Sequence, residues 1–220
     1  MKIQLVDYNE ELCNEWRKAF GGCDDITVYC ENYFDVQTDC YISPANSYGF
    51  LDGGIDNKLR KFYEKLGIDI EKTVQDIIID KFDGELLVGQ AFYFPLFSFN
   101  SKKIPDLIVA PTMRVPMKLP ENSVNVYLAM RAILLKLKSL NWSGSSSPKV
   151  KSVSICGLGT GIGQLPYDLC AKQMRKAYDD FWVGEKYFPK SWGEAQDNHQ
   201  LLYCDKISGD LQYDKPNLEL

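Results

Sequence analysis

Two glycine-rich loops, each placed between an apolar strand and a helix, constrain this sequence more than any other feature. The first loop reads Ser43-Pro-Ala-Asn46-Ser-Tyr-Gly-Phe-Leu-Asp52-Gly-Gly-Ile-Asp56. The second, Gly157-Leu-Gly159-Thr-Gly161-Ile-Gly163, repeats the strand-to-helix arrangement later in the chain. Glycine turns at helix starts let backbone N–H groups converge on an anionic ligand. Two such loops indicate a ligand with more than one anionic group.

Composition limits the choice of partners and compartment. The 220 residues suit one large domain, and we expect a single domain over 1–220 with a peripheral tail at 205–220. A formal net charge of −5 argues against a nucleic-acid backbone as partner. No apolar run reaches transmembrane length, and the N-terminus lacks the pattern of a signal peptide. We therefore expect a cytoplasmic protein with no nucleic-acid groove and no membrane contact.

Cysteine and histidine usage limits the chemistry. The seven cysteines form no CxxC pair, which argues against zinc ribbons and thioredoxin chemistry. We expect reduced thiols, with Cys30, Cys40, Cys156 and Cys204 acting as small hydrophobes in apolar strand-like runs. The single histidine, His199, rules against multi-histidine metal sites and Ser–His or Cys–His mechanisms. We expect neither metal nor cofactor, so acid–base chemistry falls to carboxylates or to the substrate itself.

Short apolar runs alternate with helical patterns, which predicts an α/β layered fold with both loops at the carboxyl ends of strands. We expect strands at 3–6, 26–30, 40–43, 86–91, 107–111, 153–156 and 201–204. We expect helices at 12–20, 53–66, 68–82, 124–140 and 167–183. An irregular connection is expected at 184–200, and a polar connector within the domain at 143–148.

The first loop carries two polar side chains, Asn46 and Asp56, which bracket whatever its backbone holds. Gly53-Gly54-Ile55 at the helix start offers free N–H donors and the positive end of the helix dipole. Because a carboxylate repels phosphate, Asp56 fits better beside a sugar hydroxyl or a water. The alternative is that Asp52 caps the helix and Asp56 merely complements its dipole.

The second loop excludes two common nucleotide motifs. It has neither the lysine of a Walker loop nor the Rossmann Gly-x-Gly-x-x-Gly spacing with a distant acid. No lysine or arginine lies in either loop, so neutral backbone donors would hold the anion. This arrangement suits a diphosphate between two sugars. A tight turn formed for packing is the alternative.

Taken in order, these residues resemble the macrodomain family. Ser43-Pro-Ala-Asn46 followed by Gly53-Gly54-Ile55-Asp56 is similar to its Asn-Ala-Ala-Asn … Gly-Gly-Val-Asp signature. Gly159-Thr160-Gly161-Ile162 resembles its Ser-Thr-Gly-Ile loop, and Gly84-Glu85-Leu86 its Gly-Glu-Ala motif. The resemblance covers about 26–183. It implies a three-layer α/β/α sandwich with a mixed, mostly parallel central sheet.

Macrodomains bind ADP-ribose, and some hydrolyse it from proteins, nucleic acid or small conjugates. The resemblance implies that Asn46 hydrogen-bonds the distal ribose and that Asp56 orients or deprotonates the attacking water. It implies substrate contacts from Gly53, Gly54, Ile55, Gly159, Thr160, Gly161, Ile162 and Gly163. Asn32 falls where the family has an acid that binds the adenine amino group, and Tyr203 is a candidate to flank the adenine.

Three positions depart from the family pattern. Ser43 replaces the first asparagine, Gly159 the serine of the second loop, and Gly163 the aromatic that packs on the distal ribose. Tyr48 or Phe50 can supply that aromatic instead. Three functions stay open within the family: a metal-free mono-ADP-ribosyl hydrolase, a non-catalytic ADP-ribose-binding module, and an ADP-ribose 1″-phosphate phosphatase. Outside the family, the alternative is an α/β protein that binds another nucleotide.

Overall fold

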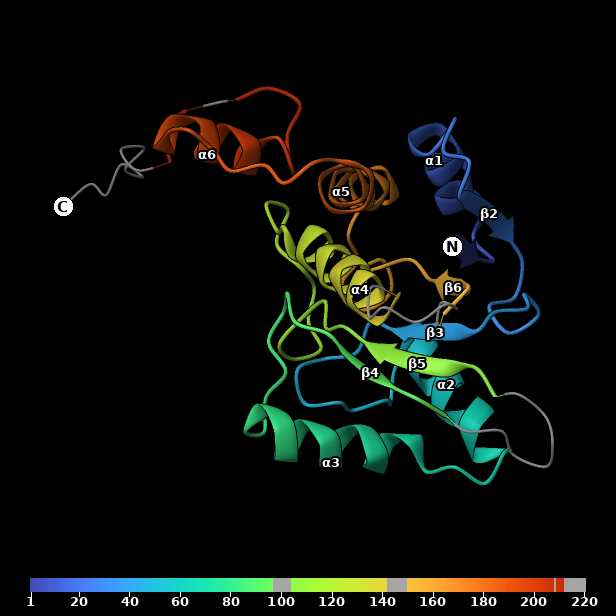
Figure 1. Cartoon of the computed structure of the whole chain (residues 1–220). Helices are drawn as coiled ribbons and strands as arrows, with labels where there is room; N and C mark the ends of the chain where they lie inside the picture. Colours follow the sequence, from blue (N-terminus) through green and yellow to red (C-terminus); the bar gives the residue numbers. More distant parts are fainter. Residues whose placement is uncertain (97–103, 142–149, 208, 212–220) are drawn as a thin grey trace.

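The computed structural model describes residues 1–96, 104–141, 150–207 and 209–211. In these residues six strands form one sheet in the order β2-β1-β6-β3-β5-β4 (Figure 1). Neighbouring strands are parallel, except that β4 runs antiparallel to β5. The predicted mixed, mostly parallel sheet is therefore confirmed. The strands are β1 (Lys2–Asp7), β2 (Ile26–Cys30), β3 (Cys40–Ser43), β4 (Phe92–Phe94), β5 (Asp106–Val109) and β6 (Ser152–Ile155).

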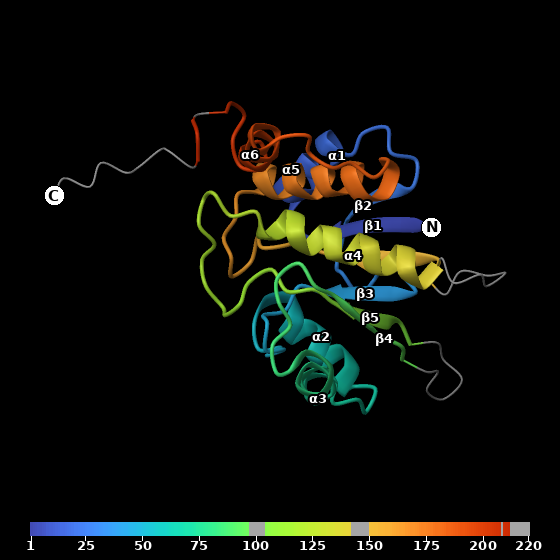
Figure 2. The same ribbon diagram turned by 60° about the vertical axis from the view of Figure 1, so that its left-hand side comes forward.

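Helices cover both faces of the sheet (Figures 1 and 2). On one face, α1 (Glu10–Ala19) and α4 (Asn125–Asn141) each pack against α5 (Tyr167–Tyr178). On the other face lie α2 (Gly54–Glu64) and α3 (Ile70–Phe82). All four residues of β3 are buried, as expected of a parallel strand covered on both sides. The three-layer α/β/α arrangement is confirmed.

The segment after α5 differs from the expectation. The helix expected at 167–183 is present, but its last turn is a π-helix, η1 (Asp179–Val183). The connection expected to be irregular contains α6 (Trp192–Gln200), which extends away from the three layers (Figure 1). Ser191 caps α6, because its hydroxyl accepts a 3.1 Å hydrogen bond from the N–H of Glu194. This Ser-x-x-Glu spacing was the sequence signal for a helix start.

Two expected strands are wrong. The segment 86–91 is a loop, in which Leu86 N–H bonds the carbonyl of Ser47 in the first glycine loop at 2.9 Å. The segment 201–204 is a turn after α6, where the N–H groups of Tyr203 and Cys204 both donate to the carbonyl of Gln200. Since these donors are satisfied within the turn, the segment does not join the sheet.

The remaining expectations concern the cysteines and the polar segments. All seven cysteines are free; Cys40 and Cys156 are buried, and burial raises the pKa of both thiols. Cys30 and Cys204 are half-buried, so they are less enclosed than expected. The connector at 143–148 and the tail end at 212–220 lie outside the described residues. In the described ranges, no helix has the length and apolar character needed to cross a membrane.

Candidate ligand-binding site

A cavity of about 350 Å³ lies at the carboxyl ends of the parallel strands. Open α/β sheets bind their ligands at this edge. The turn after β1 and the segments that follow β3, β5 and β6 all line it. It brings together the predicted residues Asn32, Asn46, Gly53, Gly54, Ile55, Asp56, Gly159, Thr160, Gly161, Ile162 and Gly163.

The two glycine loops meet at this cavity. A β-carbon on Gly53 would lie 2.5 Å from Cδ1 of Ile162, so the Ile162 side chain of the second loop packs directly over this glycine of the first. Residues 110–119, the third loop, connect the other two. Ser47 N–H donates to the carbonyl of Met113 at 3.2 Å, and Leu119 N–H donates to the carbonyl of Gly163 at 2.9 Å. Backbone hydrogen bonds therefore tie three loops into one cavity wall.

The start of α2 presents backbone N–H groups in this wall. Its N-cap is Gly53, which has no side chain to bond the first-turn N–H groups of Gly54, Ile55 and Asp56. The alternative that Asp52 caps this helix is therefore wrong. In the second loop, the N–H groups of Ile162 and Gly163 donate to no protein group in the described residues. Free N–H groups at a helix start and in a glycine loop attract anions.

Asp56 places a carboxyl group at the same wall. Ser43, fully buried at the end of β3, donates a 2.6 Å hydrogen bond from its hydroxyl to Oδ1 of Asp56. Burial of the carboxyl raises the pKa of Asp56 to about 7, the Ser43 hydrogen bond opposes this rise, and the nearby Asp52 adds to it. A carboxyl group with a pKa near neutrality is suited to general acid–base chemistry.

Asn46 lines the cavity, but hydrogen bonds within the first loop occupy most of its amide. Its Oδ1 accepts from the N–H groups of Tyr48 at 3.1 Å and Phe50 at 3.3 Å. Its Nδ2 donates to the carbonyl of Phe50 at 2.9 Å. Phe50 itself lines the cavity, whereas Tyr48 does not and instead stacks with Arg114, 5.4 Å from its ring centroid. Of the two aromatics left open by the sequence, the geometry favours Phe50.

The turn after β1 lines the cavity and was missed by the sequence analysis. Asp7 accepts a 2.9 Å hydrogen bond from the N–H of Asn9, whose Nδ2 donates to the hydroxyl of Tyr167 at 3.0 Å. Tyr8 is 73% exposed, and the ammonium of Lys58 lies 4.7 Å from its ring centroid. The signal was an apolar run that ends in polar residues, as at the other site strands. Thr112, Met113 and Pro116 of the third loop also line the cavity, and of these Thr112 follows an apolar run in the same way.

Tyr203 does not line the cavity, so the prediction that it flanks the ligand is wrong. It lies in the turn after α6, and its ring is edge-on to His199 with the centroids 5.6 Å apart. Tyr8, at the end of β1, is an exposed tyrosine that does line the cavity. Within the described ranges, no cluster of three or more histidine, cysteine or acidic residues is arranged to hold a metal ion.

The fold and this cavity define an α/β protein with a crevice between two glycine loops, at the carboxyl ends of its parallel strands. The chain belongs to the Macro domain family, which it matches over residues 42–174. The resemblance seen in the sequence is thereby confirmed. A curated relative, an uncharacterized protein from Aquifex aeolicus (strain VF5), is 29% identical over 150 residues, 68% of this chain and 78% of the relative.

Solved structures share the fold. The macrodomain of Mycobacterium tuberculosis DarG aligns with a TM-score of 0.53 at 15% identity, over 68% of this chain and 86% of its own. Thermosipho africanus DarTG in complex with ADP-ribose aligns with a TM-score of 0.55 at 14% identity, over 84% of this chain and 55% of its own. At these identities the likeness concerns the fold alone.

Proposed function

We propose that this protein binds ADP-ribose between the two glycine loops and hydrolyses the bond that joins ADP-ribose to a conjugated group. The observation that carries the proposal is Asp56, a desolvated carboxyl held by Ser43 in the wall of an anion-binding cavity. Membership of the macrodomain family supports the choice of ligand. The ADP-ribose complex of Thermosipho africanus DarTG, which has the same fold, supports it as well.

The diphosphate binds at the start of α2 and at the second loop. The N–H groups of Gly54 and Ile55 and those of Ile162 and Gly163 supply neutral donors from the two sides. The dipole of α2 adds a favourable field for the negative charge. Lys58, the one lysine or arginine among the described lining residues, supplies positive charge from α2.

The adenine binds at the end of the cavity formed by β1 and β2. Asn32 is exposed just after β2, and its carboxamide oxygen can accept a hydrogen bond from the adenine amino group. Tyr8 provides an exposed ring on which the base stacks. The distal ribose then lies at the Asp56 end, where Phe50 supplies the aromatic surface.

Hydrolysis at this end is a displacement at the anomeric carbon C1″. Asp56 accepts a proton from a water molecule, the water oxygen bonds C1″, and the bond from C1″ to the conjugated group breaks. The conjugated group leaves with the electron pair and takes up a proton from solvent, and Asp56 then releases its proton to solvent, so that one water molecule is consumed. Asn46 holds the first loop, and the remaining hydrogen on its Nδ2 is available to a ribose hydroxyl.

Two assays on the full chain test the proposal. Calorimetric titration is expected to show tighter binding of ADP-ribose than of AMP, ATP or NAD, and equal affinity for AMP would contradict the ligand assignment. In a release assay, Asp56→Asn is expected to slow liberation of ADP-ribose from a modified peptide or nucleobase by roughly 10²–10⁴-fold while ADP-ribose affinity stays within about threefold. Binding without release by the wild-type protein would identify a non-catalytic module and refute the hydrolytic step.

A further inference from the structure

We infer that the site takes ADP-ribose joined at C1″ to an uncharged group with an apolar face and binds ADP-ribose 1″-phosphate more weakly. The inference rests on the proposed function, because it names the substrate class of the same cavity. Three features of the cavity support it: where the anion-binding donors lie, which charges surround the distal ribose, and which side chains form the adjacent rim.

The anion-binding groups of the cavity are already used by the diphosphate. The first turn of α2 and the second loop hold two phosphates between them. Next to them are two carboxyl groups, Asp52 and Asp56, which both line the cavity and lie close enough to interact electrostatically. A phosphate on the distal ribose would place further negative charge against these carboxylates.

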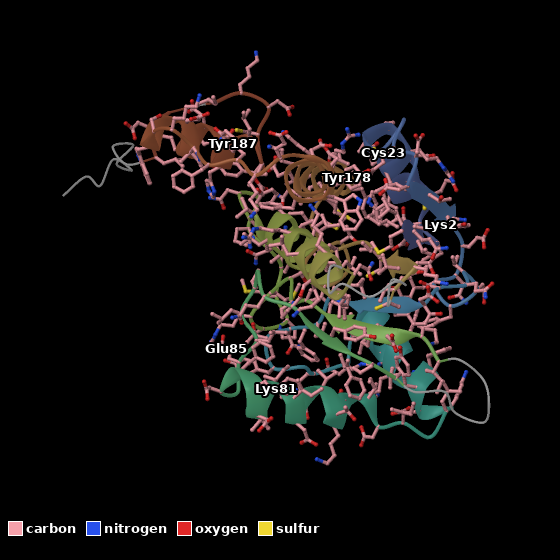
Figure 3. All side chains as sticks on the ribbon, viewed as in Figure 1. Lys2, Cys23, Lys81, Glu85, Tyr178 and Tyr187 are labelled. Carbon is pink, nitrogen blue, oxygen red and sulfur yellow. The ribbon has the colours of Figure 1, made fainter. Side chains whose placement is uncertain are left out.

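No positive group balances these carboxylates in the described lining. Lys58 is the one cation there, and it lies over the ring of Tyr8 beside the turn after β1. Arg114 of the third loop does not line the cavity. Its guanidinium forms hydrogen bonds of 2.6 and 3.1 Å with the carboxylate of Glu85, just past the end of α3 (Figure 3). Sites for phosphate monoesters usually supply such cations directly to the phosphate.

Part of the rim of the cavity is apolar. Phe50, Pro116 and Ile162 line it, and each comes from a different one of the three loops. Ile162 is 44% exposed, and Phe50, whose ring the distal ribose covers only in part, is 51% exposed in the described structure. A group on C1″ that carries an apolar face would bury these side chains and remove them from water. The rim therefore suits an uncharged conjugate.

Calorimetry with three ligands that share the ADP-ribose anchor tests this inference. At pH 8 and low salt, the full chain is titrated with ADP-ribose, ADP-ribose 1″-phosphate and 1″-O-benzyl ADP-ribose. We expect the 1″-phosphate to bind roughly tenfold more weakly than ADP-ribose, and the benzyl compound at least as tightly. Affinity for the 1″-phosphate equal to that for ADP-ribose, or a benzyl compound that binds more weakly than ADP-ribose, would overturn it.

A pair of variants separates the local charge from the net charge. Asp52→Asn is expected to lower the ratio of the dissociation constant for the 1″-phosphate to that for ADP-ribose by about threefold. Asp80→Asn makes the same charge change on the exposed surface of α3, outside the cavity lining, and is expected to leave the ratio unchanged. Equal effects of both variants would refute the role of Asp52. Failure of ADP-ribose itself to bind would refute the proposed function, whereas equal binding of both nucleotides would refute this inference alone.

Discussion

The hydroxyl of Ser43 donates a 2.6 Å hydrogen bond to the carboxyl group of Asp56 and thereby joins the end of β3 to the first turn of α2. The bond fixes Oδ1 of Asp56 and leaves Oδ2 for a water molecule. It also favours the ionised carboxylate in a place where burial disfavours it. Ser43, which stands where the family pattern has an asparagine, is therefore a positioning residue for Asp56.

The pH dependence of turnover should follow from this pair. Asp56 acts as a base only when ionised, so the rate of ADP-ribose release should rise with pH and level off above its pKa of about 7. Ser43→Ala removes a hydrogen bond that lowers this pKa, so the inflection should move to higher pH. The measurement is a pH–rate profile of kcat/KM for both proteins.

The matched control for this profile is Ser154→Ala. Ser154 is equally buried, on β6, and its hydroxyl bonds Oε1 of Gln4 at 3.3 Å rather than a carboxyl in the cavity. The inflection in the pH–rate profile of Ser154→Ala should stay at the wild-type pH. An unchanged inflection in Ser43→Ala would show that this hydroxyl does not tune Asp56.

The free energy of unfolding should depend on pH through the carboxyl group of Asp56. The pKa of Asp56 rises from 3.8 to about 7 on folding, so the native state binds more protons than the unfolded chain between these values. The contribution of Asp56 to stability is therefore lost as pH rises from about 4 to 7.

Asp56→Asn carries no charge and keeps an oxygen to accept the bond from Ser43. Urea unfolding should show Asp56→Asn to be more stable than the wild type by more than about 1 kcal/mol at pH 8, with a smaller gain at pH 5. A less stable variant at pH 8 would contradict the desolvation of this carboxyl.

The second loop allows a test of its tight geometry. A β-carbon at Gly163 would lie 2.4 Å from the carbonyl oxygen of Gly159, a backbone atom that cannot move aside, whereas one at Gly161 meets nothing within 4 Å. Gly163→Ala should therefore lower the free energy of unfolding by roughly 1–3 kcal/mol, and Gly161→Ala by less than about 0.5 kcal/mol. Denaturant titration of the two variants measures this. Equal losses would mean that the loop does not approach itself as closely as the structure indicates.

Two tyrosines distinguish the observed site from the one expected from sequence. Tyr8→Ala should weaken ADP-ribose binding by roughly tenfold, because base–aromatic stacking is worth about 1–3 kcal/mol. Tyr203→Ala is the control, since Tyr203 lies outside the cavity, and its affinity should match that of the wild type. If calorimetry shows a larger loss of ADP-ribose affinity for Tyr203→Ala than for Tyr8→Ala, the adenine does not bind beside Tyr8.

The sequence predicted the parts of the site that depend on local chemistry. Glycine loops between a strand and a helix mark free N–H donors wherever they occur, and the cavity indeed contains both loops together with Asn46 and Asp56. Asn32 also lies in the lining, at the position that the family resemblance implied. Five of the six strands, β1, β2, β3, β5 and β6, were predicted because their apolar runs leave a clear pattern, whereas β4 (Phe92–Phe94) was not predicted.

The sequence did not reveal which strand lies beside which. β1 pairs with both β2 and β6, and this places the turn of Tyr8 next to the second loop. The sequence also predicted a strand at 201–204, because apolar residues in a short turn give the same pattern as apolar residues in a strand. Lys58 has no local signal either, because its place in the cavity depends on how α2 packs across the sheet edge.

The most direct test of this binding mode is a crystal structure of the full chain with ADP-ribose. We expect the diphosphate on the N–H groups at the start of α2 and in the second loop, with C1″ of the distal ribose beside Asp56 and the adenine beside Tyr8. A structure with ADP-ribose bound elsewhere, or with the distal ribose at the Tyr8 end, would contradict it.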